Sequence, residues 1–309
     1  MQSEITSKKG LHLPDNIKVH FAGAEVMPQF IACKELGVNY ALYTAFPFVE
    51  RMVFGVGKSP IMPLRWMTNP AIEIPTFINQ SCRHTIQDSG LFTLLFGSRK
   101  NTKVDEALID KWYDNLVQFT LDHGQPVTCV EVDCQGLVGM KKVWELRERM
   151  SRDLPNNRII HVFHVDDGQY ELDKLIEYSD YIGYSAPQFL RTGSSNYISK
   201  IARYIKNKKP FADIHLLGCT AQKLLRENSF CTSCDSTTYT APKRYGFLAG
   251  KHIRNLSTER IIEYFGKELF ELVMEYNNEQ NTRTMLLSIK DCMNKYQEYC
   301  GNQDYKNHK

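Results

Sequence analysis

The sequence lacks several features that would assign it to a class at once. No apolar run reaches the roughly 18–20 residues that a membrane-spanning helix needs. Residues 1–10 are polar and contain no apolar core of a secretory signal, so we expect a cytoplasmic protein. Hydrophobic residues make up 42% and charged residues 24% of the 309 positions, a mixture typical of a globular domain with one large core.

Regularly spaced cysteines and a strong net charge are also missing. The nine cysteines are scattered and odd in number, which predicts reduced, buried thiols. Only Cys231 and Cys234 form a C-x-x-C pair, which is typical of two ordinary thiols or of a redox or metal pair. The net charge of +3 selects no partner. Basic residues cluster at 206–209 and 243–254, and such clusters are solvated faces unless they flank a site for a polyanion.

Short apolar strands alternate with helix-like segments, and this order predicts the fold. Strands are expected at residues 17–25, 39–46, 84–88, 127–133, 158–165, 181–185, 213–218 and 230–235. A long helical tail follows, with one apolar stripe at Ile261, Phe265, Leu269, Leu272 and Tyr276. The pattern predicts an α/β protein: a (β/α)8 TIM barrel over residues 1–256 and a C-terminal helical extension over 257–309. A doubly wound sheet would need a Gly-rich turn after the first strand, where the sequence reads A-G-A-E.

Acidic residues follow five of the predicted strands. These residues are Glu25, Asp88, Asp133, the pair Asp166 and Asp167, and Asp235, with His164 beside the pair. One such residue can be a helix cap, as Asp88 before Ser89 could be. Five are costly to bury unless they are paired or used, and the carboxyl ends of barrel strands form the active-site face. We therefore expect a cavity lined by carboxylates.

Two carboxylates on separate strands suit double displacement at an anomeric carbon, in which one is the nucleophile and the other the general acid/base. Metal-assisted hydrolysis is the alternative chemistry for aspartate and histidine at strand ends. That chemistry favours several inward histidines, such as an H-x-H after the first strand, and only His20 lies there.

Three segments resemble the tRNA-guanine transglycosylase family. They are D-S-G-L-F-T at residues 88–93, H-L-L-G-C-T at 215–220 and C-D-S-T-T-Y-T at 234–240. The compact form, opening with F-A-G-A-E at residues 21–25, looks most like the DNA-guanine transglycosylase branch. Enzymes of that branch insert 7-deazaguanine bases into phage or bacterial DNA. The resemblance spans roughly residues 17–250.

The resemblance implies a base-exchanging glycosyltransferase with a role for each matching residue. Asp235 matches the nucleophile, which attacks C1′, expels guanine and forms a covalent glycosyl-enzyme. Asp88 matches the acid/base aspartate. Asp133 matches the residue that binds the Watson–Crick edge of the base, and His164 stands where the family uses a glutamine. Gly183 lies where a backbone group contacts the base.

Chemistry at C1′ requires the nucleotide to leave the duplex, which adds further candidates. Phe92 or Tyr184 could stack on the extruded base, or could equally be core packing. The basic segment after the predicted nucleophile could hold flanking phosphates, with a solvated loop as the alternative. Its residues are Lys243, Arg244, Lys251 and Arg254.

The sequence departs from the family in one respect, because the C-x-C-x-x-C zinc motif of the tRNA enzymes is missing. The cysteines and histidines beyond Asp235 give no four-ligand spacing, so no metal or other cofactor is assigned, although Cys231 and Cys234 leave a zinc site open. The missing motif favours DNA over tRNA as the substrate. The incoming base is expected to be a 7-deazaguanine such as 7-cyano-7-deazaguanine. A tRNA enzyme, a non-catalytic base-binding subunit and a glycoside hydrolase remain as alternatives.

Overall fold

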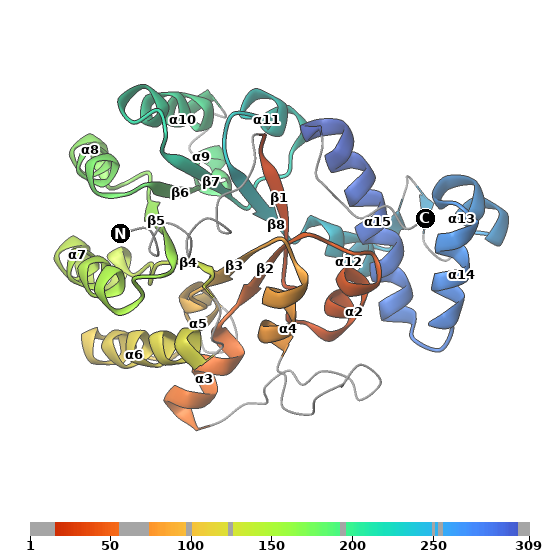
Figure 1. The fold of residues 1–309 in the computed structure, drawn as a ribbon, viewed down its shortest axis with the longest axis horizontal. Coiled ribbons are helices and arrows are strands. Elements are labelled where there is room, and N and C mark those ends of the chain that lie inside the picture. The colour runs from red at the N-terminus through yellow and green to blue at the C-terminus, as the bar shows by residue number, and fades with distance from the viewer. Residues whose placement is uncertain are drawn as a thin grey trace, which may run out of the picture.

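The computed structural model describes residues 16–55, 74–96, 101–122, 126–191, 196–248, 251–252 and 256–301. Eight parallel strands pair in chain order and close into a barrel when β8 pairs with β1 (Figure 1). This arrangement confirms the predicted (β/α)8 barrel. The strands are β1 (Lys18–Ala22), β2 (Tyr40–Thr44), β3 (His84–Asp88), β4 (Thr128–Val130), β5 (Arg158–Phe163), β6 (Tyr181–Ser185), β7 (Asp213–Leu217) and β8 (Ser233–Ser236).

The predicted strand bounds agree with the structure at β3 and β6 and run too long elsewhere. The largest differences are at β1, which ends at Ala22, and at β4, which ends at Val130 although the predicted strand continues to Asp133. At β4 the reason is a side chain that replaces backbone pairing. The Glu131 carboxylate accepts the backbone N–H of Val162 on β5 at 2.7 Å, so the regular ladder stops there.

Helices alternate with the strands and surround the barrel (Figure 1). The helices before β8 are α2 (Met27–Glu35), α3 (Phe46–Phe54), α4 (Ile74–Ser81), α5 (Leu91–Phe96), α6 (Glu106–Asp122), α7 (Gln135–Asp153), α8 (Gly168–Tyr178), α9 (Ala186–Arg191), α10 (Asn196–Lys208) and α11 (Gln222–Glu227). Successive strand residues point to opposite faces, so outward side chains pack under the helices. The inward ones form a separate apolar cluster of Ala22, Leu42, Ile86, Val130, Ile160, Val162 and Tyr181.

A layer of polar side chains also lies in the barrel interior. His20 and His84 are joined by a 2.8 Å hydrogen bond, and His84 bonds the Thr128 hydroxyl at 2.9 Å. Burial lowers the pKa of His20 to about 3, and the neighbouring His215 adds to the effect, so His20 is neutral at physiological pH. His20 and His84 are therefore hydrogen-bonded to each other inside the barrel, and His20 is uncharged there.

The chain after β8 first forms a small unit and then three helices. The small unit contains the 3-10 helix η2 (Thr238–Thr240), α12 (Ala241–Tyr245) and the antiparallel pair β9 (Phe247–Leu248) and β10 (Lys251–His252). The helices are α13 (Thr258–Phe265), α14 (Lys267–Glu275) and α15 (Gln280–Cys300). The predicted continuous stripe is broken at Gly266, whose φ of 88° ends α13. Val273 is buried in α14, whereas the predicted Leu272 is half-buried.

Helix α15 takes the place of the eighth helix of the barrel. It packs against α2 and α11, the helices on either side of the gap, and the Tyr296 ring lies 5.7 Å from that of Phe21 on β1. Helices α13 and α14 lie outside α15 (Figure 1). A division at residue 256 thus separates the strands from the helix in the eighth position, and of the described helices after residue 256 only α13 and α14 lie outside the ring of barrel helices. No helix in the described ranges has the length and apolar character needed to cross a membrane.

Candidate active site

Three aspartates gather where the barrel strands end. Asp88 is the last residue of β3, Asp133 follows β4, and Asp235 lies in β8. The negative charges of Asp235 and Asp133 both raise the pKa of Asp88, which shows that the three carboxylates share one electrostatic environment. The strand-end pattern in the sequence had suggested this convergence, and the closed barrel provides it.

The Asp235 carboxylate is held by two N–H groups of β7 and its following turn. Its Oδ1 lies 3.1 Å from His215 Nε2 and accepts the Gly218 backbone N–H at 3.0 Å. Gly218 has a φ of 68°, and an added Cβ would lie 3.1 Å from Pro187, so the turn that aims this N–H favours glycine. The Asp235 side chain is 13% exposed, so water or a ligand can still reach it although His215 and Gly218 hold it in place.

His215 is held in turn by a buried hydroxyl pair. Its Nδ1 lies 2.6 Å from the Ser233 hydroxyl, and Ser233 lies 2.5 Å from the Tyr181 hydroxyl. When Nδ1 accepts the hydroxyl proton of Ser233, Nε2 carries the proton and donates to Asp235. In that tautomer the ring supports a carboxylate at Asp235. The sequence alone indicates no role for His215 beyond its place in the H-L-L-G-C-T segment.

Asp88 has an environment of the opposite kind. Burial is the main cause that raises its pKa to about 6, and the other two aspartates add to the shift. Its Oδ1 accepts the Gly90 N–H at 2.8 Å and the Thr44 hydroxyl at 3.4 Å. Gly90 has a φ of 78°, and an added Cβ would lie 2.6 Å from the Phe46 backbone nitrogen. The glycine of D-S-G is thus required by close packing, and Asp88 can carry a proton near neutral pH.

Glu25 is a second buried acid beside Asp88. It is 6% exposed, and its Oε2 accepts the Thr44 backbone N–H at 3.2 Å. Burial raises its pKa to about 7, and the charge of Asp88 contributes to the shift. Thr44 therefore connects the two acids, with its N–H on Glu25 and its hydroxyl on Asp88. The sequence indicated Glu25 only as one of the strand-end acids.

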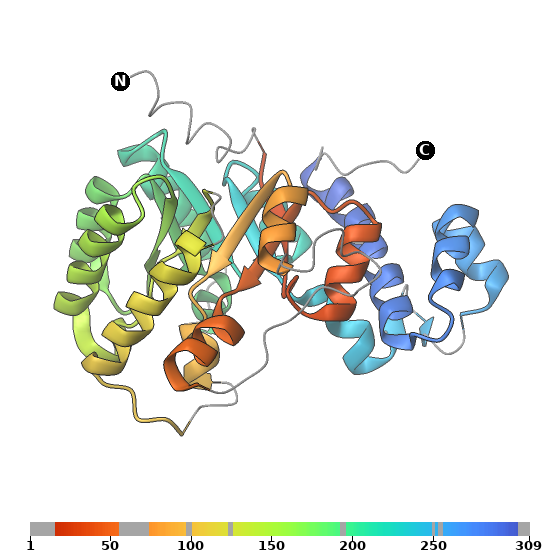
Figure 2. The same ribbon diagram turned by 60° about the horizontal axis from the view of Figure 1, so that its bottom comes forward.

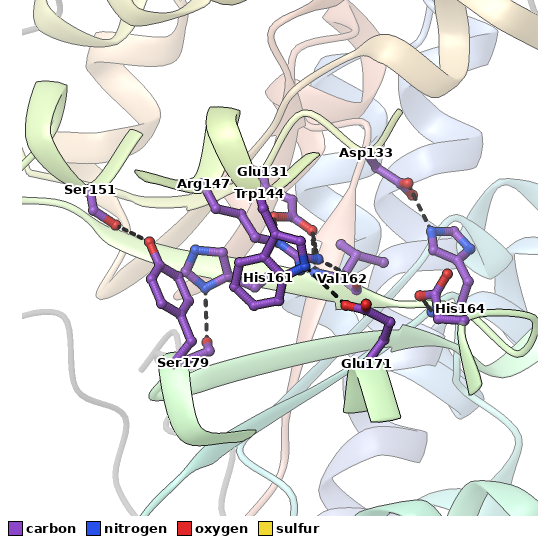
Figure 3. A network of polar contacts seen from close by, with 12 residues as sticks. Glu131, Asp133, Trp144, Arg147, Ser151, His161, Val162, His164, Glu171 and Ser179 are labelled. Atoms are coloured by element: carbon purple, nitrogen blue, oxygen red, sulfur yellow. Dashed lines mark hydrogen bonds and ion pairs between the residues drawn. The ribbon is translucent and has the colours of Figure 1, made fainter. Parts of the chain in front are cut away.

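Asp133 and His164, which follow the neighbouring strands β4 and β5, form a pair (Figure 3). The His164 Nε2 and the Asp133 Oδ1 lie 2.8 Å apart. Burial opposes protonation of His164, but the hydrogen bond and charge of Asp133 outweigh it and raise its pKa. Asp167 fixes the backbone of the pair by accepting the His164 N–H at 2.7 Å. Both side chains keep some exposure, 23% for His164 and 36% for Asp133, so they can meet a ligand.

Behind this pair lies a buried ion pair that has a structural role. Arg147 on α7 donates to both carboxylate oxygens of Glu131, at 2.7 and 2.8 Å, and to the Val162 carbonyl at 3.1 Å (Figure 3). The Arg147 guanidinium also lies 4.6 Å from the centre of the Trp144 ring. Because the side chains of Glu131 and Arg147 are only 3% and 2% exposed, the pair anchors α7 to β4 and β5 beneath the site.

The structure corrects one predicted base-stacking residue. Tyr184 points away from the barrel interior into the helix layer, where it is fully buried. Its hydroxyl donates to the Ile198 carbonyl at 2.7 Å and its ring contacts Phe189. The alternative of core packing is the right one, because an outward side chain on β6 cannot reach the barrel mouth. Phe92, the other candidate, is 71% exposed at the start of α5 and stays a prediction.

Gly183 faces the barrel interior, where an added Cβ would lie 2.7 Å from the Ile160 side chain. Tight packing thus requires a glycine at this position. The predicted contact of its backbone with the base stays a prediction. Of the predicted phosphate-binding residues, Lys243 and Arg244 are exposed on α12 and Lys251 is exposed on β10. Arg254 lies outside the described residues.

In the described part of the chain, no group of three or more His, Cys, Asp or Glu side chains is placed to hold a metal ion. Cys231 and Cys234 are both buried free thiols. Burial raises the pKa of each well above that of an exposed thiol. Metal ligation and redox reactions need the thiolate, so the environment of this C-x-x-C pair favours ordinary buried thiols.

No family model matches the sequence, and no curated protein matches it. Among solved structures, an oxaloacetate acetylhydrolase is 12% identical with a TM-score of 0.43, and the match covers 86% of this chain and 94% of that one. A GH18 chitinase from Pseudoalteromonas aurantia is 10% identical with a TM-score of 0.40, covering 71% and 93%. N-acetylneuraminate lyase from Fusobacterium nucleatum is 9% identical with a TM-score of 0.40, covering 95% and 99%. Similarities this weak do not bear on the reaction.

Proposed function

We propose that this protein is a base-exchange glycosyltransferase that replaces guanine in DNA by a 7-deazaguanine base. The observation that carries the proposal is a pair of carboxylates at one barrel face in opposite surroundings. Asp235 accepts the Gly218 N–H at 3.0 Å and lies 3.1 Å from His215 Nε2, two groups that can stabilise a carboxylate. Asp88 is buried and has its pKa raised to about 6. Double displacement needs one carboxylate that attacks and one that carries a proton, and these surroundings suit that division.

In the first step, an Asp235 carboxylate oxygen attacks C1′ of the extruded nucleotide as the bond from C1′ to guanine N9 breaks. Protonated Asp88 supplies the proton that lets guanine leave as a neutral base. In the second step, ionised Asp88 takes the N9 proton of the incoming base, N9 attacks C1′, and the bond from C1′ to Asp235 breaks. The exchange is therefore balanced in protons, and both carboxylates return to their starting states.

The Asp133–His164 pair supplies base recognition in this proposal. A guanine presents N1–H and a 2-amino group as donors, and the free capacity of the Asp133 carboxylate can accept them. A 7-deazaguanine such as 7-cyano-7-deazaguanine presents the same edge, so one subsite serves both the leaving and the incoming base. His164 fixes the orientation of Asp133 through its 2.8 Å hydrogen bond. No cofactor enters either step.

The test is incubation of the protein with radiolabelled guanine and, separately, duplex DNA or bulk tRNA, followed by counting of acid-precipitated label. We expect incorporation into DNA and its loss in Asp235→Asn, which should still fold and bind base. Label in tRNA alone would assign the protein to the tRNA enzymes instead. Release of guanine without incorporation would indicate a hydrolase. If neither guanine nor 7-cyano-7-deazaguanine is transferred, the proposed enzymatic activity is contradicted and a base-binding subunit is favoured.

A further inference from the structure

The small unit formed by η2, α12, β9 and β10 follows β8, the strand of Asp235. It is firmly attached, because the Tyr239 hydroxyl of η2 donates to the Ala22 carbonyl at 2.7 Å and Ser288 of α15 donates to the Tyr239 carbonyl. Helix α12 leaves the carboxyl end of β8, and Figure 2 shows it along the lower edge of the molecule together with α5, which follows Asp88. The unit therefore lies on the side of the barrel that holds the aspartates.

Two aromatic and three cationic side chains are exposed together on this unit. Tyr245 is 71% exposed and Phe247 is 60% exposed. The cations are Lys243, Arg244 and Lys251, and no carboxylate of the described residues lies within 4.0 Å of them. Exposed aromatic rings between unpaired cations are typical of surfaces that bind single-stranded nucleic acid, because the rings stack on bases and the cations bind phosphates.

Another exposed aromatic residue of the protein has different surroundings. Phe211 is 95% exposed at the amino end of β7 and also follows lysines in the sequence. Those lysines are paired, Lys208 with Asp173 and Lys209 with Asp180, both at 2.7 Å. Sequence composition alone therefore does not distinguish the two regions, whereas the ion pairs do.

A cavity of about 310 Å³ lies between α12 and the start of α15. Among the described residues, the lining provides cations and neutral polar groups and no carboxylate. The polar side chains are those of Lys243, Arg244, His252, Gln280, Asn281 and Thr284. The first turn of the 21-residue α15 opens on it, so the positive end of the helix dipole faces the same space. A group with negative charge and several acceptor oxygens, such as a phosphodiester, fits this lining.

The wall of the cavity is preformed. Gly246 has a φ of 76°, and an added Cβ would lie 2.7 Å from His252 Nε2, so the histidine packs directly on the glycine backbone. The His252 ring also meets the Phe247 ring edge to face at 5.4 Å. These contacts hold Phe247 in place beside the cavity, which reduces the ordering cost of binding.

We propose that residues 242–248, residues 251–252 and the first turn of α15, here named the α12 surface, bind one strand of unpaired DNA. A phosphate occupies the cavity, and neighbouring bases stack on Tyr245 and Phe247. The choice of DNA rests on the proposed function. The consequence is a substrate preference, since the protein should bind strand-separated DNA more tightly than closed duplex.

The test is fluorescence anisotropy with a short labelled oligonucleotide, single-stranded and in duplex, over a series of salt concentrations. Tyr245→Ala with Phe247→Ala should weaken single-strand binding by about tenfold or more, leave the salt dependence unchanged and alter duplex binding little. Lys243→Gln with Arg244→Gln should weaken binding of both forms and lower the salt slope by about 2, one for each phosphate contact.

Phe211→Ala and Arg152→Gln are the matched controls, because both residues are exposed near the amino ends of the strands. They should bind like the wild type, and all variants should melt at the wild-type temperature because the changed side chains are on the surface. Wild-type affinity in the aromatic variant, or equal losses for single strand and duplex, would overturn the proposal. The anisotropy assay measures binding and needs no base exchange. A protein that binds single-stranded DNA as expected but does not exchange bases would therefore contradict the proposed function and leave the binding proposal intact. Tighter binding of single-stranded RNA than DNA would overturn the choice of DNA.

Discussion

Replacing Asp88 by asparagine should make the protein more stable and inactive at the same time. The pKa of Asp88 rises from 3.8 to about 6 in the folded protein, roughly two units, and each unit corresponds to about 1.4 kcal/mol. Ionised Asp88 therefore destabilises the fold by up to about 3 kcal/mol. Because water reaches part of the side chain, we expect about 2 kcal/mol. Asparagine keeps the Oδ1 that accepts from Gly90 and Thr44, so the local geometry should survive.

The sign of the pH dependence follows from the direction of the shift. A carboxyl whose pKa is higher in the folded than in the unfolded protein contributes stability below the unfolded value, and that stability is lost as pH rises through about 6. The gain of the Asp88→Asn variant over the wild type should thus be largest near about pH 8, roughly half as large near about pH 5 and absent below both pKa values.

Urea unfolding followed by tryptophan fluorescence measures this difference, provided that the slope with urea is the same for both proteins. Asp166→Asn is the control, because Asp166 is an exposed acid that also follows a barrel strand. This substitution should change the free energy of unfolding by less than about 0.5 kcal/mol. An Asp88→Asn variant that is less stable than the wild type at pH 8, or whose gain does not shrink toward acid, would refute the reasoning. The variant should also lose base exchange.

Two further substitutions test the supporting groups. His215→Asn removes the 3.1 Å contact with Asp235. Because His215 is proposed to position the nucleophile without touching substrate, kcat should fall by about 10²-fold with little change in KM for the base. A change in KM alone would contradict this role. Glu131→Gln leaves Arg147 buried without its carboxylate and should cost about 3–5 kcal/mol in urea unfolding. Adding Arg147→Met should cost less than the sum of the two single changes, and strict additivity would show that the pair does not act as a unit.

The barrel was predictable from the sequence because the alternation of short apolar runs and helical periods is a local property. The eighth helix was not, since periodicity locates α15 without identifying its packing partners. Those partners, α2 and α11, are far away in the chain. The break at Gly266 was also missed, because the apolar stripe continues across it and only the backbone shows the positive φ.

The site was predictable to the extent that strand-end acids mark one face of a barrel. Whether Tyr184 points into the barrel or toward the helices could not be predicted, because β6 is apolar on both faces. Its sequence therefore does not indicate which residues face inward. The link from His215 to Asp235 depends on the register of β7 and β8, which pairs His215 with Ser233. That register is set by the closed barrel, not by either strand alone.

The most direct test of the account is trapping of the covalent intermediate. The protein is mixed with labelled, guanine-containing DNA, quenched in denaturant without an incoming base, and resolved on a denaturing gel. Peptide mass spectrometry then locates the attached sugar. The account predicts an adduct on the peptide that contains Asp235 and no adduct with Asp235→Asn. Base exchange without an adduct, or an adduct on a different residue, would contradict it.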